Sequence, residues 1–401
     1  MTSFGYNTLG FGAFPSRGNP GLGLWVWGTN NAGEMGSGSN SDANNRRSTP
    51  TQLGTDVDWF GLAFRNNAAG HVAALKGTPD ANGGGELYMW GDNYHGQLGL
   101  GDKNNRSVPV QVGSKTDWVS VSMADGITHA IDGDGKLYAW GKDDDNGVFG
   151  NSRATDNQSA PVQIGALTNW SKQIAHTHDG DSCIAIKTDG TMWSWGINNV
   201  GQLGTGTVVQ RSSPLQIGAL TTWSQIAAAS QTCLALKTDG TIWVWGKNTY
   251  GELGLGLTDA NVLKSSPVQI GSDTNWAKIS GAQDNFGAIK TTGALYMWGR
   301  GTVGEIGQGT VVNASVPTQV GSDTDWLEVF VASQHVLAIK TNGEMYAWGE
   351  NRSQGNLGIG TVVSMSVPTQ VNIGTDWGPD YALSNTISGG NHTTQALRPE
   401  Q

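Results

Sequence analysis

Charged residues, cysteine and long apolar segments are all scarce in this chain of 401 residues. Charged residues make up 14% of it, and 23 Lys and Arg against 33 Asp and Glu give a net charge of -10. A chain with this charge is not expected to bind the phosphate backbone of nucleic acid. Two cysteines exclude a disulfide framework. No apolar run reaches the roughly 18 residues of a transmembrane helix. The first 20 residues lack a basic start and a continuous apolar stretch, so we expect no secretory signal.

Glycine and tryptophan are abundant, with 60 and 17 copies, and the tryptophans reveal a repeat. Gly does not follow the every-third-residue period of collagen. An aromatic-x-Trp-Gly motif occurs seven times, about 53 residues apart on average. Its tryptophans are Trp27, Trp90, Trp140, Trp195, Trp245, Trp298 and Trp348. A second series is Trp59, Trp118, Trp170, Trp223, Trp276, Trp326 and Trp377. The aromatic residue of the motif is itself Trp at Trp25, Trp193 and Trp243, so all 17 Trp belong to the repeat. We expect these rings to fill the space within and between the units.

Each repeat unit contains four predicted strands. In the unit that starts at Trp223, the first strand follows this residue and the second is CLALK at 233–237. An Asp-Gly turn, typical of a hairpin, leads to the third strand at 241–246. The fourth is PVQIG at 267–271, where Pro is expected to start the strand. No segment has helical periodicity.

Seven units of four strands predict an all-β fold, a seven-bladed β-propeller with four antiparallel strands per blade. The chain begins with a third strand and ends with a second strand. Residues 377–398 and 24–54 therefore complete one blade and close the ring. A linear solenoid would need distinct capping repeats instead. The predicted domains are an N-terminal arm at 1–20, rich in Gly and aromatic residues, and the propeller at 21–401.

The segment LALKTDGTIWVWGKNTYGELGLG at 234–256, followed by Pro-x-Gln, resembles the repeats of the regulator of chromosome condensation family. The resemblance covers about residues 21–398 and implies a seven-bladed propeller whose closing blade combines two strands from each end. Known members act as guanine nucleotide exchange factors for a small GTPase, as chromatin binders or as protein-binding modules. The family's His, five residues before the hairpin Lys, is kept only at His71 and His335, and a basic tail for chromatin is lacking. The regular units and their GSDTDW and IGALTTW connectors resemble bacterial and bacteriophage propellers.

Two polar clusters contain residue types that can bind metal ions. The first combines His and carboxylate side chains, as a transition metal prefers, at His176, His178, Asp179 and Asp181. The second offers the oxygen ligands of Ca²⁺ at Asp143, Asp144 and Asp145, near Asp132 and Asp134 in a hairpin turn. Neither spacing matches a standard site. We therefore expect a polar loop and a solvated acidic edge, with no metal and no cofactor.

Cys183 and Cys233 occupy the same position of neighbouring units, in the second strand. We expect both to be buried packing residues, because equivalent positions of adjacent blades are too far apart for a disulfide. A catalytic Cys-His pair is not expected. The chain also lacks a P-loop, a dinucleotide fingerprint and the common hydrolase motifs, so we predict no enzymatic activity.

The N-terminal arm carries four aromatic residues, Phe4, Tyr6, Phe11 and Phe14, among Gly, Ser and Asn. One interpretation is a disordered terminus. The other is an extended arm whose aromatic rings dock onto a neighbouring subunit.

The favoured function is a non-catalytic propeller that mediates protein–protein interactions in a larger assembly. A bacteriophage virion component, such as a decoration, fibre or adaptor protein, and a bacterial surface protein are the favoured settings. A guanine nucleotide exchange or regulatory module and a glycan-binding propeller are the alternatives.

Overall fold

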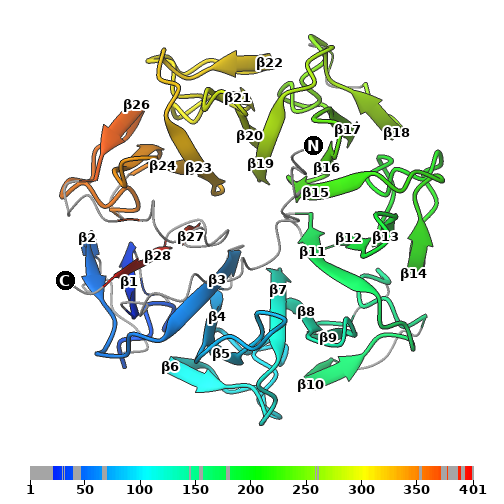
Figure 1. Cartoon of the computed structure of the whole chain (residues 1–401), viewed down its shortest axis with the longest axis vertical. Coiled ribbons are helices and arrows are strands. Elements are labelled where there is room, and N and C mark those ends of the chain that lie inside the picture. Colours follow the sequence, from blue (N-terminus) through cyan, green and yellow to red (C-terminus); the bar gives the residue numbers. More distant parts are fainter. Residues whose placement is uncertain are drawn as a thin grey trace, which may run out of the picture.

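Seven four-stranded antiparallel sheets stand around a ring in the computed structural model (Figure 1). The structure describes residues 21–28, 30, 32–38, 47–65, 70–143, 146–152, 157–177, 181–257, 259, 262–351, 355–371, 377, 387–389 and 393–399. Within these ranges there are strands and turns but no helix, and hence none long enough to span a membrane. The predicted seven-bladed propeller is confirmed.

Six blades are continuous in sequence, and their strands run in order from the centre of the ring to its rim (Figure 1). Blade 1 contains β3 (Trp59–Arg65), β4 (His71–Lys76), β5 (Glu86–Gly91) and β6 (Arg106–Gln111). Blade 2 contains β7 (Trp118–Ala124), β8 (Ile127–Asp132), β9 (Leu137–Gly141) and β10 (Gln158–Gln163). Blade 3 contains β11 (Trp170–His176), β12 (Ser182–Lys187), β13 (Met192–Gly196) and β14 (Arg211–Gln216).

The same order holds in the second half of the ring. Blade 4 contains β15 (Trp223–Ala228), β16 (Thr232–Lys237), β17 (Ile242–Gly246) and β18 (Lys264–Gln269). Blade 5 contains β19 (Trp276–Ala282), β20 (Asn285–Lys290), β21 (Leu295–Gly299) and β22 (Ala314–Gln319). Blade 6 contains β23 (Trp326–Val331), β24 (His335–Lys340), β25 (Met345–Gly349) and β26 (Met365–Gln370).

Blade 7 closes the ring with strands from both ends of the sequence. Its order is β27 (Ile387–Gly389), β28 (Thr393–Pro399), β1 (Leu22–Gly28) and β2 (Arg47–Gln52), counted outward. β1 and β28 pair over seven residues, from Leu22 opposite Pro399 to Gly28 opposite Thr393. The predicted two-plus-two closure is therefore confirmed.

The fourth strands begin earlier than the sequence indicated. β18 starts at Lys264, so Pro267 lies inside the strand, and the prediction that Pro starts it was wrong. The strand tolerates Pro because it is the outer edge of its sheet, where one side of the backbone has no partner strand. The pairing register with β17 also shifts between Val244 and Gly246, which is a further irregularity of this edge.

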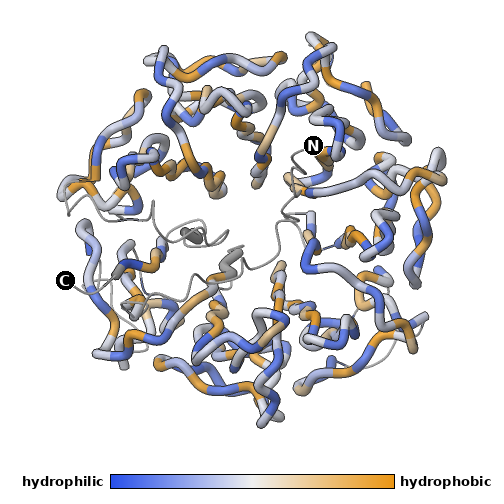
Figure 2. Tube along the Cα trace, viewed as in Figure 1, coloured by the Kyte–Doolittle hydropathy of each residue, from blue (hydrophilic) through white to orange (hydrophobic). Residues whose placement is uncertain are grey.

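Hydrophobic residues are buried mainly in the second and third strands of each blade, and Figure 2 shows further hydrophobic segments on outer strands. Every residue of β16 is buried, although its side chains alternate between the two faces of the sheet. Both faces are covered because each blade packs against a neighbour on either side. The propeller core is thus a series of interfaces between sheets.

The tryptophan of each Trp-Gly pair links its blade to the preceding one. Trp245 is fully buried, and its indole Nε1 donates a hydrogen bond to the carbonyl oxygen of Gln202 at 2.9 Å. Gly204 has φ +68°, and a Cβ there would lie 2.8 Å from the same indole nitrogen, so only Gly admits this ring. The same bond occurs at all seven junctions, from Trp27, Trp90, Trp140, Trp195, Trp245, Trp298 and Trp348.

A backbone hydrogen bond forms a second link between blades, near the rim. In blade 4 the N–H of Gly256 donates to the carbonyl of Ser315 in β22 of blade 5, at 2.8 Å. The equivalent bonds start from Gly38, Gly101, Ser152, Gly206, Gly309 and Gly360. Every junction is therefore fixed both inside the ring and at its periphery.

Trp245→Ala is expected to lower the free energy of unfolding by about 3–5 kcal/mol, since it removes a fully buried ring. Trp245→Phe keeps an aromatic ring and loses the donated hydrogen bond and part of the buried volume, so we expect a smaller loss. Urea denaturation of both variants measures this. A loss below about 1 kcal/mol for the Ala variant would show that the ring does not hold the junction.

Deleting residues 377–401 removes β27 and β28 and leaves β1 without its seven-residue pairing. We expect the truncated protein to unfold or to oligomerise through the exposed strand edges. Size-exclusion chromatography and thermal melting test this. A monomer with an unchanged Tm would contradict the role of the closing blade.

Candidate functional site

Exposed hydrophobic residues gather on the loops that join the third and fourth strands of blades 3 to 6. Blades 3, 5 and 6 carry the same Thr-Val-Val sequence in this loop, and the valines are 51–66% exposed. Blade 4 has Leu263 there, at 43%. Exposed residues of the adjoining fourth strands extend the surface. We call this set the apolar rim: Val208, Val209, Leu215, Leu263, Val311, Val312, Val316, Val362, Val363 and Val367.

The loops of the apolar rim are held from beneath by polar contacts to their backbone. In blade 3 the buried side chain of Asn198 donates to the carbonyls of Thr207 and Val209, at 2.9 and 3.1 Å. Asn351 donates in the same way to Thr361 and Val363 in blade 6. The valine side chains are therefore displayed on a fixed backbone.

In blade 5 the loop with the exposed valines is held by a different contact. Gly301 stands at the position of the asparagine, and a Cβ there would lie 2.0 Å from the carbonyl oxygen of Val312. Its N–H donates to the side-chain oxygen of Asn313 at 3.0 Å. Only Gly permits this close approach of the loop. In blade 5 the valine pair is therefore held by the backbone of Gly301 and not by an asparagine side chain at that position.

Blade 1 shows that the pinned loop does not itself require valine. Asn93 donates to the carbonyls of Asp102 and Asn104, as its counterparts do in blades 3 and 6. Lys103 and Asn104, both exposed, occupy the places of Val208 and Val209. The valine pairs are thus a departure from the repeat in blades 3, 5 and 6. Blade 4 adds Leu263 and has exposed Asp259 at the place of Val209, and blade 1 exposes Tyr94 in its loop and Val108 at the strand position of Val316. The repeated Thr-Val-Val sequence is the signal for the valine pairs, although these loops were not among the sites predicted from the sequence.

The outer strands of the blades resist pairing with another strand. Each has a proline at its fourth position: Pro50, Pro109, Pro161, Pro214, Pro267, Pro317 and Pro368. Proline cannot donate a ladder hydrogen bond, so these edges are poor templates for an added strand. Contact at the rim is therefore expected through side chains.

A cation lies over two aromatic rings at the opposite end of each blade, where the second strand turns into the third. Lys237 Nζ is 3.7 Å from the ring centre of Trp243 and 5.1 Å from that of Trp223. Such contacts stabilise by about 0.5–2 kcal/mol each. The cations of the seven blades are Lys76, Lys115, Lys187, Lys237, Lys290, Lys340 and Arg398.

The acidic residues around these cations differ between blades. Asp273 and Asp323 bind Lys290 and Lys340 at 2.8 and 2.7 Å. In blades 3 and 4 the corresponding positions hold exposed Leu167 and Leu220. Burial lowers the pKa of Lys187 and of Lys237. By contrast, the pKa of Lys340 is raised, because Asp323 and Asp325 outweigh its burial.

Blade 2 also has a cation over its two aromatic rings, but this residue precedes the first strand instead of ending the second. Asp132 stands at the position of the hairpin lysine. Lys115 lies over the ring of Trp118, and its Nζ binds the carboxylate of Asp132 at 2.9 Å. Burial acts to lower the pKa of Lys115, but Asp132 and Asp117 outweigh it and raise the value. Asp134 pairs with Lys136 at 2.8 Å. Each of these predicted acidic candidates therefore has a lysine partner.

Lys115→Met is expected to cost about 2 kcal/mol of unfolding free energy, because it leaves the Asp132 carboxylate, whose side chain is 0% exposed, without its cation. The double variant Lys115→Asp with Asp132→Lys recreates the arrangement of blade 6. We expect it to recover most of the loss in urea denaturation. A double variant as unstable as the single one would show that the two arrangements are not interchangeable.

The structure describes only some of the remaining predicted site residues. His178, Asp179, Asp144 and Asp145 lie outside the described residues, as do Phe4, Tyr6, Phe11 and Phe14 of the arm. Asp181 accepts a hydrogen bond from Asn146 at 3.2 Å, and the backbone N–H of Asp143 donates to Asn157 at 3.2 Å. Cys183 and Cys233 are buried and form no disulfide, as predicted.

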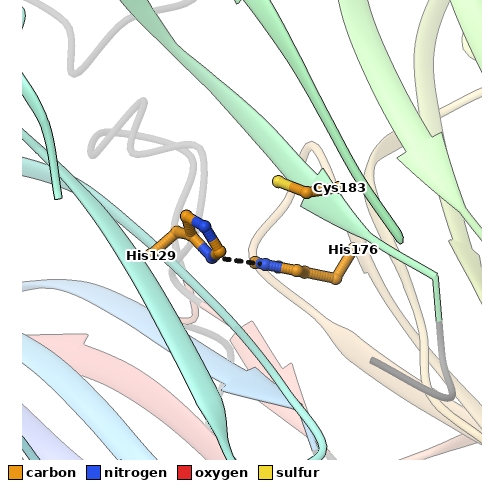
Figure 3. Close-up of side chains that lie close together, drawn as sticks. All are labelled: His129, His176 and Cys183. Carbon is orange, nitrogen blue, oxygen red and sulfur yellow. Dashed lines mark hydrogen bonds between the residues drawn. The ribbon is translucent and has the colours of Figure 1, made fainter. Parts of the chain in front are cut away.

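His176 is buried and meets a histidine that the sequence analysis did not consider. Its Nε2 lies 2.8 Å from Nδ1 of His129 in blade 2, and Cys183 lies beside the pair (Figure 3). Burial lowers the pKa of His129 to about 4, so this imidazole is neutral at neutral pH. The prediction that Cys183 is a buried packing residue thus omitted its two histidine neighbours.

Known proteins share this architecture over almost the whole chain. The family model for the RCC1-like domain matches residues 23–395. The ultraviolet-B receptor UVR8 of Arabidopsis thaliana is 32% identical over 202 residues, which are 48% of this chain and 41% of the receptor. The mouse E3 ubiquitin-protein ligase HERC2 is 28% identical over 199 residues, 49% of this chain and 4% of the ligase. The alignments thus span less than half the length of these relatives.

Solved structures agree with the fold. Prp20p from Saccharomyces cerevisiae superimposes with a TM-score of 0.78 at 21% identity, covering 95% of this chain and 92% of that one. Human WBSCR16 gives a TM-score of 0.78 at 19% identity, covering 94% and 99%. The likeness at these identities is one of fold. Together with the family match over residues 23–395, it shows that this chain belongs to the RCC1-like domain family.

Proposed function

We propose that this chain is a non-catalytic protein-interaction propeller that binds a partner protein through its apolar rim. The observation that carries the proposal is the set of exposed valine pairs in blades 3, 5 and 6, on loops that polar contacts hold in place, with Leu263 between them in blade 4. Contiguous exposed hydrophobic patches mark interaction sites in soluble proteins.

The geometry of the rim favours a partner that offers apolar side chains of its own. The loop backbones are already fixed by Asn198, Asn351 and Gly301, so little backbone entropy is lost on binding. The prolines of the outer strands disfavour a partner that would add a strand. The partner is therefore expected to contribute a hydrophobic surface, such as the apolar face of a helix.

The names of structural relatives support a protein partner. The structure of Prp20p was described together with its binding properties to Gsp1p and histones, and that of yeast RCC1 (Prp20) as bound by Kap60. These partners are those of the yeast protein. What we transfer to this chain is the coarser property, recognition of another protein by the propeller.

The wider setting in our proposal is a larger assembly. The virion or bacterial surface role stays a prediction from the sequence. So does the role of the arm at 1–20 as a second attachment, through Phe4, Tyr6, Phe11 and Phe14. The two attachments are separable by experiment, because deletion of residues 2–18 leaves the rim intact and substitution of rim valines leaves the arm intact.

Val311→Asp with Val312→Asp is expected to weaken partner binding by about 30-fold, the effect of roughly 2 kcal/mol of lost apolar contact. Both side chains are more than half exposed, so the Tm is expected to stay within about 2 °C. Lys103→Asp with Asn104→Asp makes the matched change in blade 1. Equal binding by the two double variants would contradict the proposal.

Site-specific photo-cross-linking supplies the partner for that measurement. A photoreactive residue is placed at Val312 or, as the control, at Lys103, and adducts formed in the native host are identified by mass spectrometry. We expect one protein to be cross-linked from Val312 and not from Lys103. Adducts of the same yield from both positions would refute a rim-specific partner. If the cross-linked protein is a GTPase, a nucleotide-release assay tests the exchange-factor alternative. Binding to a glycan array tests the glycan-binding alternative.

A further inference from the structure

Three side chains that bind transition metals meet at the junction between blades 2 and 3. His129 comes from β8, His176 from the end of β11 and Cys183 from β12 (Figure 3). All three are fully buried, and one ligand atom from each lies within 4.8 Å of the others. His176 and Cys183 are directly opposite each other in the pairing of β11 with β12, so the sheet itself holds two of them together.

The other blades show what the fold requires at these positions. In the strand pairing, the place of His176 opposite Cys183 is taken by Ala228, Gly281 and Val331 in blades 4, 5 and 6. His129 corresponds to Ile184, Leu234 and Leu337 in blades 3, 4 and 6. Small or aliphatic residues are thus sufficient for packing. Two departures from the repeat occur in neighbouring blades, and their imidazole nitrogens face each other at 2.8 Å.

The second nitrogen of each imidazole has a polar partner. Nε2 of His129 lies 3.4 Å from the carbonyl oxygen of Phe149. A carbonyl only accepts, so this nitrogen carries the proton and Nδ1 directs its lone pair toward the cluster. Without an ion, Nε2 of His176 donates to Nδ1 of His129. Ion binding requires the other tautomer of His176, in which Nδ1 carries the proton and donates a hydrogen bond to Oγ of Ser122, 2.9 Å away. Outer partners of this kind orient histidine ligands in metal sites.

We propose that Nδ1 of His129, Nε2 of His176 and Sγ of Cys183 bind a transition-metal ion, Zn²⁺ or Cu⁺. Both ions accept imidazole nitrogen and thiolate sulfur. Zinc lies about 2.0–2.1 Å from nitrogen and 2.3 Å from sulfur, so the ligand atoms reach it by side-chain shifts of about 1 Å. The thiol of Cys183 loses its proton when the ion binds. The ion would tie blade 2 to blade 3, in addition to the bonds that all junctions share.

Cys233 provides an internal control for the site. It occupies the same strand position in blade 4, and its Sγ donates to the carbonyl of Gln202 at 3.3 Å. Ala228, which pairs with Cys233, and Ile184 of the preceding blade stand there in place of the two histidines. If the ion is bound by all three side chains of the cluster, its binding is expected to require Cys183 but not Cys233.

The test is to produce the full chain in medium supplemented with zinc or with copper, purify it through a tag without histidine, and measure bound metal by mass spectrometry. We expect about one equivalent of one of the two ions per chain. We also expect a Tm higher than that of chelator-treated protein. Absence of both ions from the folded protein, with a Tm insensitive to chelator, would overturn the proposal.

Variants that copy other blades separate metal binding from folding. His176→Ala, His129→Leu and Cys183→Val introduce residues found at the same positions elsewhere in the ring, so we expect folded proteins with at least tenfold less metal. Cys233→Val is expected to keep it. Unchanged metal in His176→Ala would overturn the site. X-ray absorption of the loaded wild-type protein gives an independent answer, because sulfur and imidazole ligands are expected and a shell of oxygen alone would refute them.

Discussion

The hydrogen bond from a buried indole to a carbonyl of the preceding blade is the interaction on which the ring depends. A blade alone is a small four-stranded sheet that cannot bury both of its faces. The tryptophan fills the gap between two blades, and its N–H finds a partner only in the neighbouring one, as Trp245 does at Gln202. The glycine at 204 is required because the ring lies against its backbone. The composition of the chain, rich in Trp and Gly, follows from repeating this contact seven times.

The repeat made the fold predictable, and departures from it were harder to interpret. The number of blades, the four strands and the closure followed from motif spacing, since each unit must solve the same packing problem. The start of the fourth strand was misplaced because Pro267 is tolerated inside an edge strand. The meeting of His129 and His176 could not be predicted from spacing. It depends on which faces of two blades pack together, and a polar residue in a strand does not indicate its neighbour across the junction.

In the loops after the third strands, the residues that hold the backbone are different from those that are exposed to solvent. Buried asparagines fix the loop backbone through its carbonyls in polar and apolar blades alike, as Asn93 and Asn198 show. The outward side chains are then free to change without cost to the ring. One chain can therefore present lysine and asparagine on blade 1 and valine on blade 5 while its core stays the same.

Blade 7 also determines how the ring responds to a pulling force. Leu22 and Pro399 are opposite each other at one end of the β1–β28 pair, with Gly28 and Thr393 at the other end. A force that draws residues 22 and 399 apart loads the hydrogen bonds of this pair one after another, like a zipper, instead of shearing all of them together. Under such a load the sheet that closes the propeller therefore opens bond by bond, starting from the end where Leu22 faces Pro399.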